Sequence, residues 1–190
     1  MSTIKPVAKI EAIAPFPDMA LPLLWNWIEE ARSAYTDDFS TATPDEFIAI
    51  ERESASIANV ATFAIYRDFE IGGYVKAVQT SPIVVECSCI FKREFYGSAT
   101  TLPALQMVAR QLFDAGIERI TMSVYAHNSA IKSLIKKLGG AEEGRLRNYT
   151  KQNGQPVDLV IFGLLKADFE NQFNPAPKLD SEPWHQKLSA

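Results

Sequence analysis

The sequence is poor in the residues that build metal and redox sites. It contains two cysteines, Cys87 and Cys89, and two histidines, His127 and His185. Because the cysteines lie two residues apart on an extended segment, they point the same way, with side chains too far apart for an easy disulfide. No CxxC pair accompanies the histidines, so we expect no metal site. We expect reduced, buried thiols rather than a reactive thiolate.

Long apolar runs and an excess of positive charge are also missing. No segment approaches the roughly 18 to 20 apolar residues that a membrane span needs. The start of the chain, MSTIKPVAKIEAIAPF, lacks the continuous apolar core of a secretory signal. A net charge of −4 and a pI near 5.3 disfavour a nucleic-acid partner. We therefore expect a cytoplasmic protein that has no membrane partner.

The remaining composition is that of a globular domain. The chain has 190 residues, of which 47% are hydrophobic and 22% charged, which is enough apolar material for one ordinary core. We expect a single domain over residues 1–169. Residues 170–190 are polar and rich in proline, so we expect a loosely ordered C-terminal tail there.

The order of periodic segments predicts a mixed α/β domain. We expect strands over residues 7–14, 59–67, 73–79, 83–91, 119–126 and in a hairpin at 143–166, with helices after residues 15, 43, 101 and 128. We expect the segment Asp68–Gly73 to be a glycine-bearing hairpin turn, and the apolar strand Ile83–Phe91 to be buried on both faces. The unit from Ile83 to Ala126 should be a right-handed crossover between parallel strands.

One strand-to-helix connection resembles an anion-binding turn. The stretch FYGSATTLPALQ, Phe95–Gln106, consists of small and hydroxyl residues that open directly into an apolar-periodic helix. Free N–H groups and the dipole at a helix N-terminus favour an anion, and a backbone cradle needs close approach, which glycine allows. However, the stretch holds only Gly97, so a helix start capped by serine or threonine is the alternative.

Four segments together carry a family resemblance. They are FYGSATTLPALQ, AGIERITMSVYAHN, KKLGGAEEGRLR and DLVIFGLLKADF, in this order, and the resemblance covers about residues 71–168. They resemble the GNAT superfamily of acyl-coenzyme A N-acyltransferases, and within it the branch that acetylates N-terminal alanines of ribosomal proteins, with similar proteins in tailed phages. The resemblance implies the GNAT fold, an α/β fold with a mixed central sheet, splayed parallel strands and flanking helices.

The resemblance also implies acetyl-coenzyme A as co-substrate. The positions that match the family's cofactor site are Ile90, Phe91, Tyr96, Gly97, Ser98, Ala99, Thr100, Thr101 and Asn128. Ala99 replaces the family's central loop glycine. Hydroxyl groups of Ser98, Thr100 and Thr101 could add contacts to phosphate. Asn128 matches a family asparagine, and a plain helix N-cap explains it nearly as well.

The acid–base groups depart from the family. At the positions of its general acid, a tyrosine or a serine, this chain has Ile135 and Ile131, which cannot donate a proton. We do not transfer the role to Ser133, which projects away from the helix's buried stripe. Glu86 interrupts an apolar strand and is the candidate catalytic base; the alternative is that it faces solvent or pairs with a cation. Other candidate acids are Tyr96, Tyr125 and Tyr149.

The sequence thus favours an acetyl-coenzyme A-dependent N-acetyltransferase that acts on a primary amine, either a protein N-terminus or a small molecule. The alternative is a catalytically impaired GNAT-fold binding or assembly module, and acyl transfer to a nucleobase is remoter. The sequence leaves the oligomeric state open, with a homodimer as one alternative. We expect the acidic helix at 46–55 to be a solvated face or the rim of a site for a basic acceptor.

Overall fold

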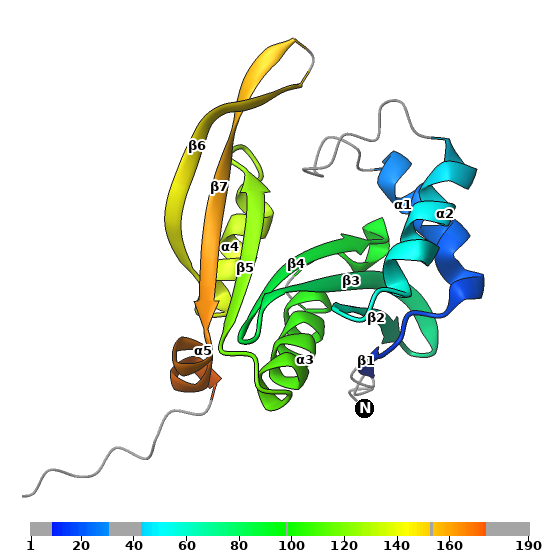
Figure 1. Ribbon diagram of the computed structural model, residues 1–190, viewed down its shortest axis with the longest axis horizontal. Helices are drawn as coiled ribbons and strands as arrows, with labels where there is room; N and C mark the ends of the chain where they lie inside the picture. The colour runs from blue at the N-terminus through cyan, green and yellow to red at the C-terminus, as the bar shows by residue number, and fades with distance from the viewer. Residues whose placement is uncertain (1–8, 31–42, 98, 153, 174–190) are drawn as a thin grey trace, which may run out of the picture.

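The computed structural model describes residues 9–30, 43–97, 99–152 and 154–173. These residues form a sheet of seven strands in the order β1-β2-β3-β4-β5-β7-β6 (Figure 1). The strands are β1 Ile10–Ile13, β2 Val60–Arg67, β3 Glu70–Ser81, β4 Val84–Phe91, β5 Arg119–Tyr125, β6 Ala141–Gln152 and β7 Gln155–Leu165. Only β4 and β5 pair in parallel within this sheet. The predicted crossover between parallel strands is thereby confirmed.

The helices cover the two faces of the sheet. They are α1 Leu21–Glu30, α2 Pro44–Ala55, α3 Thr101–Asp114, α4 Ser129–Lys137 and α5 Lys166–Phe173. Side chains alternate along β3, so Tyr74 packs with α1 and α2 while its neighbour Val75 packs with α3. In Figure 1, β6 and β7 form a long hairpin that extends as an arm beside this body.

Helix α2 begins where the sequence predicts it. The Thr43 hydroxyl accepts a hydrogen bond from the Glu46 N–H at 3.3 Å, and the Glu46 carboxylate accepts one from the Thr43 N–H at 2.9 Å. Pro44 occupies the first turn, where its missing N–H costs nothing. This reciprocal capping box fixes the residue at which the helix starts. The start in turn determines which side chains of α2 face the sheet.

The hairpin between β2 and β3 turns two residues earlier than the sequence predicts. Arg67 pairs with Glu70, and the two residues between them, Asp68 and Phe69, both have positive φ, as a type I′ turn requires. The expected turn glycines Gly72 and Gly73 instead lie inside β3. A Cβ on Gly72 would come within 2.2 Å of the Phe95 ring, so close packing explains this glycine.

We predict that Gly72→Ala destabilises the domain by about 1–3 kcal/mol, because the buried Phe95 ring cannot move away without loss of packing. Urea denaturation followed by circular dichroism measures this free energy of unfolding. The matched control is Gly144→Ala on β6, where a new Cβ would meet no atom within 4 Å. Equal stability of the two variants would contradict the packing argument.

Candidate active site

Strands β4 and β5 run side by side for only part of their length. They pair at Val84 with Arg119, Val85 with Ile120 and Glu86 with Thr121, and the described residues contain no further ladder pair between them. Both strands nevertheless continue, β4 to Phe91 and β5 to Tyr125. The edge of β4 beyond Glu86 therefore turns unpaired backbone groups toward the space that opens between the strands.

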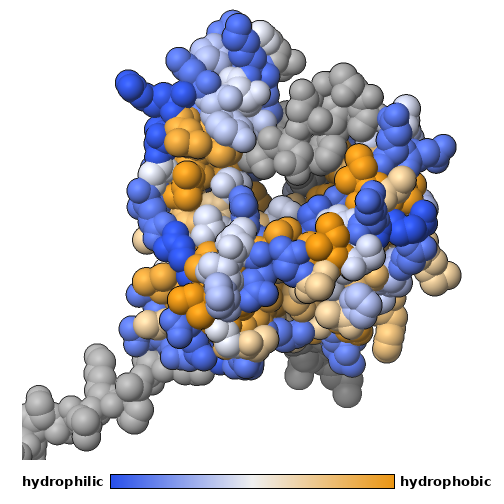
Figure 2. All heavy atoms as spheres, viewed as in Figure 1, coloured by the Kyte–Doolittle hydropathy of each residue, from blue (hydrophilic) through white to orange (hydrophobic). Residues whose placement is uncertain are grey.

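A cavity of about 380 Å³ fills this space. Its lining comes from α2, β3, β4, the loop before α3, α3 itself, β5 and α4. It meets both faces of the sheet, because Cys89 belongs to the face that α3 covers whereas Lys76 and Ser88 alternate onto the other. In Figure 2 the surface is hollowed between the arm and the body that carries α1 and α2.

The prediction that β4 is buried on both faces is wrong. Glu86 and Ser88 are exposed although their neighbours along the strand are apolar. The apolar cluster that α1 and α2 form on this face of β4 includes Ile90 and does not extend to Glu86 or Ser88. Glu86 is the last residue of β4 that pairs with β5, and it is not among the residues that line the cavity.

The loop before α3 is held by its own hydrogen bonds. The carbonyl of Gly97 accepts from the N–H groups of Thr100 at 3.3 Å and Thr101 at 3.0 Å, and the Thr101 hydroxyl donates to the Phe95 carbonyl at 2.8 Å. Gly97 has a φ of +109°, which a residue with a Cβ rarely adopts. Within the described part of the chain, the N–H groups of Gly97 and Ala99 have no hydrogen-bond partner.

Helix α4 brings its first turn to the same cavity. The Asn128 side chain accepts from the Ile131 N–H at 3.2 Å, so its predicted N-cap role is confirmed. Asn128, Ile131 and Ile135 all line the cavity. Ser133 lines it as well, although the position of the buried stripe had led us to set this residue aside. The cavity extends beyond the buried stripe onto the exposed side of α4.

Comparisons with known proteins bear on this architecture. No family model matches the chain. The chain is 26% identical over 146 residues to the SPbeta prophage-derived uncharacterized N-acetyltransferase YokL of Bacillus subtilis, a match over 76% of this chain and 71% of that protein. Among solved structures, the acetyltransferase of GNAT family from Streptococcus pneumoniae gives a TM-score of 0.66 at 16% identity, covering 83% of this chain and 99% of its own.

The structure of the RimL ribosomal alpha-N-protein acetyltransferase in complex with coenzyme A gives a TM-score of 0.71 at 15% identity, covering 84% of this chain and 96% of its own. The chain has the GNAT fold. The relative and the structural neighbours together support the GNAT-type N-acetyltransferase superfamily that the four sequence segments indicate.

Most of the predicted cofactor positions meet in the cavity of this GNAT fold. The lining residues among them are Ile90, Phe91, Tyr96, Gly97, Thr101 and Asn128. Ala99 is exposed on the loop and Thr100 is buried beside it, while Ser98 lies outside the described residues. The hydroxyl proton of Thr101 is used within the turn, where it anchors the loop to Phe95.

Sequence reasoning missed a buried polar cluster on the α2 side of the cavity. The Glu51 carboxylate accepts from the Tyr74 hydroxyl at 2.6 Å and from the Lys76 ammonium at 2.7 Å, and all three residues line the cavity. Burial, the Glu51 charge and the hydrogen bond raise the pKa of Tyr74. Glu51 follows the buried Phe47 by four residues, so helical spacing was the available signal that it faces inward.

The two thiols on β4 are free and partly buried. Burial raises the pKa of Cys89 to about 11, and it raises that of Cys87 further, with added repulsion from Cys89 and Glu86. The thiol form therefore dominates near neutral pH, and a covalent acyl-cysteine step lacks its nucleophile.

Among the described residues, no group of three or more His, Cys, Asp and Glu is placed to hold a metal. The helices described are also too short or too polar to cross a membrane.

We predict that iodoacetamide modifies Cys89 about 100-fold more slowly at pH 8 than an ordinary thiol, since its pKa stands about two units above 9.0. Mass spectrometry after timed quenching measures the rate at each cysteine. The rate should rise with pH toward 11, and unfolding in urea should restore ordinary reactivity. Rapid labelling of the folded protein at pH 7 would show that a thiolate is present.

Proposed function

We propose that this protein is an acetyl-coenzyme A-dependent N-acetyltransferase that acts on a primary amine. The observation that carries the proposal is the separation of β4 and β5 around a cavity lined by Gly97, in a loop where the N–H groups of Gly97 and Ala99 have no partner among the described residues. The N-acetyltransferase name of the YokL relative and the coenzyme A complex of the RimL neighbour support the same function.

The described residues fit an extended cofactor with phosphate at one end. The unpaired edge of β4 from Cys87 to Phe91 offers backbone groups for an amide-bearing arm. The N–H groups of Gly97 and Ala99, at the N-terminus of α3, suit the diphosphate, because free donors and the helix dipole both favour an anion. Lys137 on α4 adds a positive charge to the cavity lining. When bound, acetyl-coenzyme A would supply the acetyl group as a thioester.

The transfer itself asks little of acidic or basic side chains. The amine nitrogen forms the new C–N bond, the C–S bond breaks with its electron pair going to sulfur, and the proton lost by nitrogen balances the proton that the thiolate takes up. Ile131 and Ile135 line the cavity but cannot move protons, whereas Ser133 and Tyr96 carry hydroxyl groups there. Catalysis would rest mainly on the positioning of the two reactants.

Glu86 remains our candidate base. It sits at the apex where β4 and β5 separate, and it shares a strand face with Ser88, which lines the cavity. Its exposure is compatible with taking a proton from an amine that enters from this face and passing the proton to solvent. Both a small amine and a protein N-terminus could reach the cavity from there.

We predict that acetyl-coenzyme A binds the wild-type protein and that Ala99→Glu weakens binding about tenfold or more, because a carboxylate beside the loop repels the diphosphate. Isothermal titration calorimetry measures both dissociation constants. Ala99→Gln has nearly the same size without the charge, so it should bind much closer to the wild type. No binding by the wild-type protein would overturn the cofactor assignment.

We also predict that the protein releases free coenzyme A from acetyl-coenzyme A in the presence of a suitable primary amine. A thiol reagent follows the release, and mass spectrometry identifies the N-acetylated amine. Omission of the amine is the control for simple hydrolysis. Tight cofactor binding without acetylated product on a broad amine panel would overturn the transferase and leave the binding module.

A further inference from the structure

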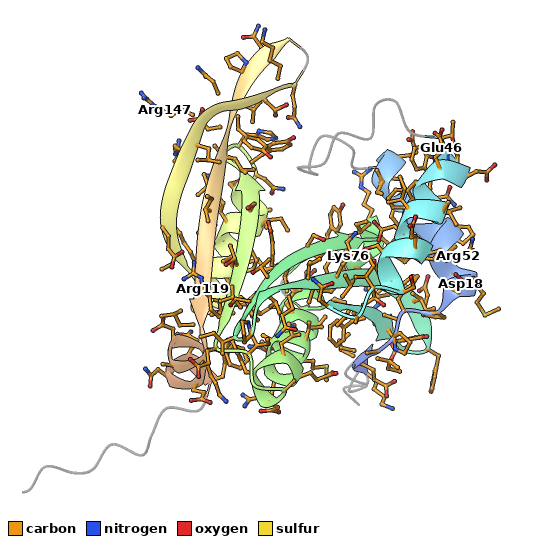
Figure 3. The ribbon with its side chains drawn as sticks, viewed as in Figure 1. Asp18, Glu46, Arg52, Lys76, Arg119 and Arg147 are labelled. Carbon is orange, nitrogen blue, oxygen red and sulfur yellow. The ribbon has the colours of Figure 1, made fainter. Side chains whose placement is uncertain are left out.

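The side of the cavity that faces α2 is built around a lysine. Lys76 lies on β3 directly opposite Ser88 of β4, and both residues line the cavity together with Glu51 and Tyr74. We call these four residues the acceptor-side wall. Strand alternation puts Tyr74, Lys76 and Ser88 on the face that α1 and α2 cover, opposite the face of α3, and Glu51 reaches them from α2. Figure 3 shows Lys76 on β3 beside α2.

The carboxylate of this wall is already engaged. Glu51 is only 7% exposed, and each of its oxygens accepts a short hydrogen bond, one from Lys76 and one from Tyr74. An incoming ammonium group would have to displace Lys76 to pair with it. The wall contains a carboxylate, but this carboxylate is poorly placed to bind the positive charge of an incoming ammonium group.

The ammonium group of Lys76 is only partly engaged. It has three donors, and among the described residues Glu51 is its only partner. Its side chain is 20% exposed and lines the cavity, where a bound ligand can reach the remaining donors. The Ser88 hydroxyl, on the neighbouring strand, can donate a further hydrogen bond toward the same point. A partly buried cation with unused donors suits an oxyanion.

We propose that the acceptor is an amine that also carries an oxyanion, such as the carboxylate of an amino acid, and that Lys76 and Ser88 bind this group. The inference rests on the proposed acetyltransferase function and narrows its substrate class. Glu51 is then a positioning residue, because it holds the Lys76 ammonium in place without touching the acceptor. Polyamines and amines without an acidic group should be poor acceptors.

The test compares each amino acid with the amine that lacks its carboxylate. L-phenylalanine is paired with phenethylamine and L-leucine with isoamylamine, and spermidine is the polycation. With wild-type protein and acetyl-coenzyme A, we expect kcat/KM to be about tenfold or more higher for each carboxylated partner, mainly through KM. Equal values within the pairs, or a preference for spermidine, would overturn the inference while leaving the transferase in place.

Variants locate the preference at Lys76. Lys76→Met should bring the ratio within each pair close to one, while Lys151→Met, at an exposed position of β6 outside the cavity, should keep it. Lys76→Met alone leaves the Glu51 charge buried without its partner. The double variant Glu51→Gln with Lys76→Met removes both charges and is tested alongside it. Thermal melting and cofactor titration verify that it folds. A folded variant that retains the preference would contradict the role of Lys76.

A binding measurement covers the case in which no amine is acetylated. N-acetyl-L-phenylalanine and N-acetylphenethylamine are titrated into the wild-type protein saturated with coenzyme A. We expect only the carboxylated compound to bind, and we expect Lys76→Met to abolish its binding. If both compounds bind equally, or neither binds, the oxyanion site is absent. The absence of turnover on its own would overturn the proposed transferase.

Discussion

The separation of β4 from β5 is the constraint on which the rest of the molecule depends. Parallel pairing ends at Glu86 and Thr121, so each strand needs its other neighbour to stay in the sheet. β3 holds β4 as far as Phe91, and β7 holds β5 along its whole length. The side chains of α3 and α4 pack beneath the two strands. The gap can thus persist without loss of the core, and it becomes a cavity that meets both faces.

The polar cluster at Glu51 is hard to explain as a stabilising device alone. A buried ion pair often gains little over apolar residues of similar size, because desolvation of the charges offsets their attraction. Here the pair sits in a cavity wall that also contains the apolar side chains of Phe47 and Ile90. Glu51 instead fixes where the Lys76 ammonium stands. A charge held at a cavity wall is more readily understood as part of a binding site.

The sequence predicts most of the secondary structure and groups together six of the residues that line the cavity, because these depend on local signals. Capping at Thr43 and Asn128 involves neighbours within a few residues. The early turn at Asp68 and Phe69 escaped prediction because the glycines that follow serve the packing of distant rings. The Glu51 cluster escaped prediction because Glu51 is 23 positions from Tyr74 and 25 positions from Lys76 along the chain. No local pattern brings such residues together.

Ile131 and Ile135 stand where the family has its general acid, but the transfer does not require a strong proton donor there. A thiol titrates near 8.5, so a thiolate can leave near neutral pH without a strong proton donor. The stricter requirement is that the attacking amine be neutral, and how easily this is met depends on the pKa of the acceptor. α-Amino groups at chain termini have pKa values of roughly 7.7 to 8.0, whereas lysine side chains titrate near 10.4. An exposed carboxylate such as Glu86 can assist the first kind of amine far more easily than the second. The side chains on α4 therefore leave the acceptor to supply a neutral amine, while Lys76 in the acceptor-side wall favours an acceptor that also carries an oxyanion.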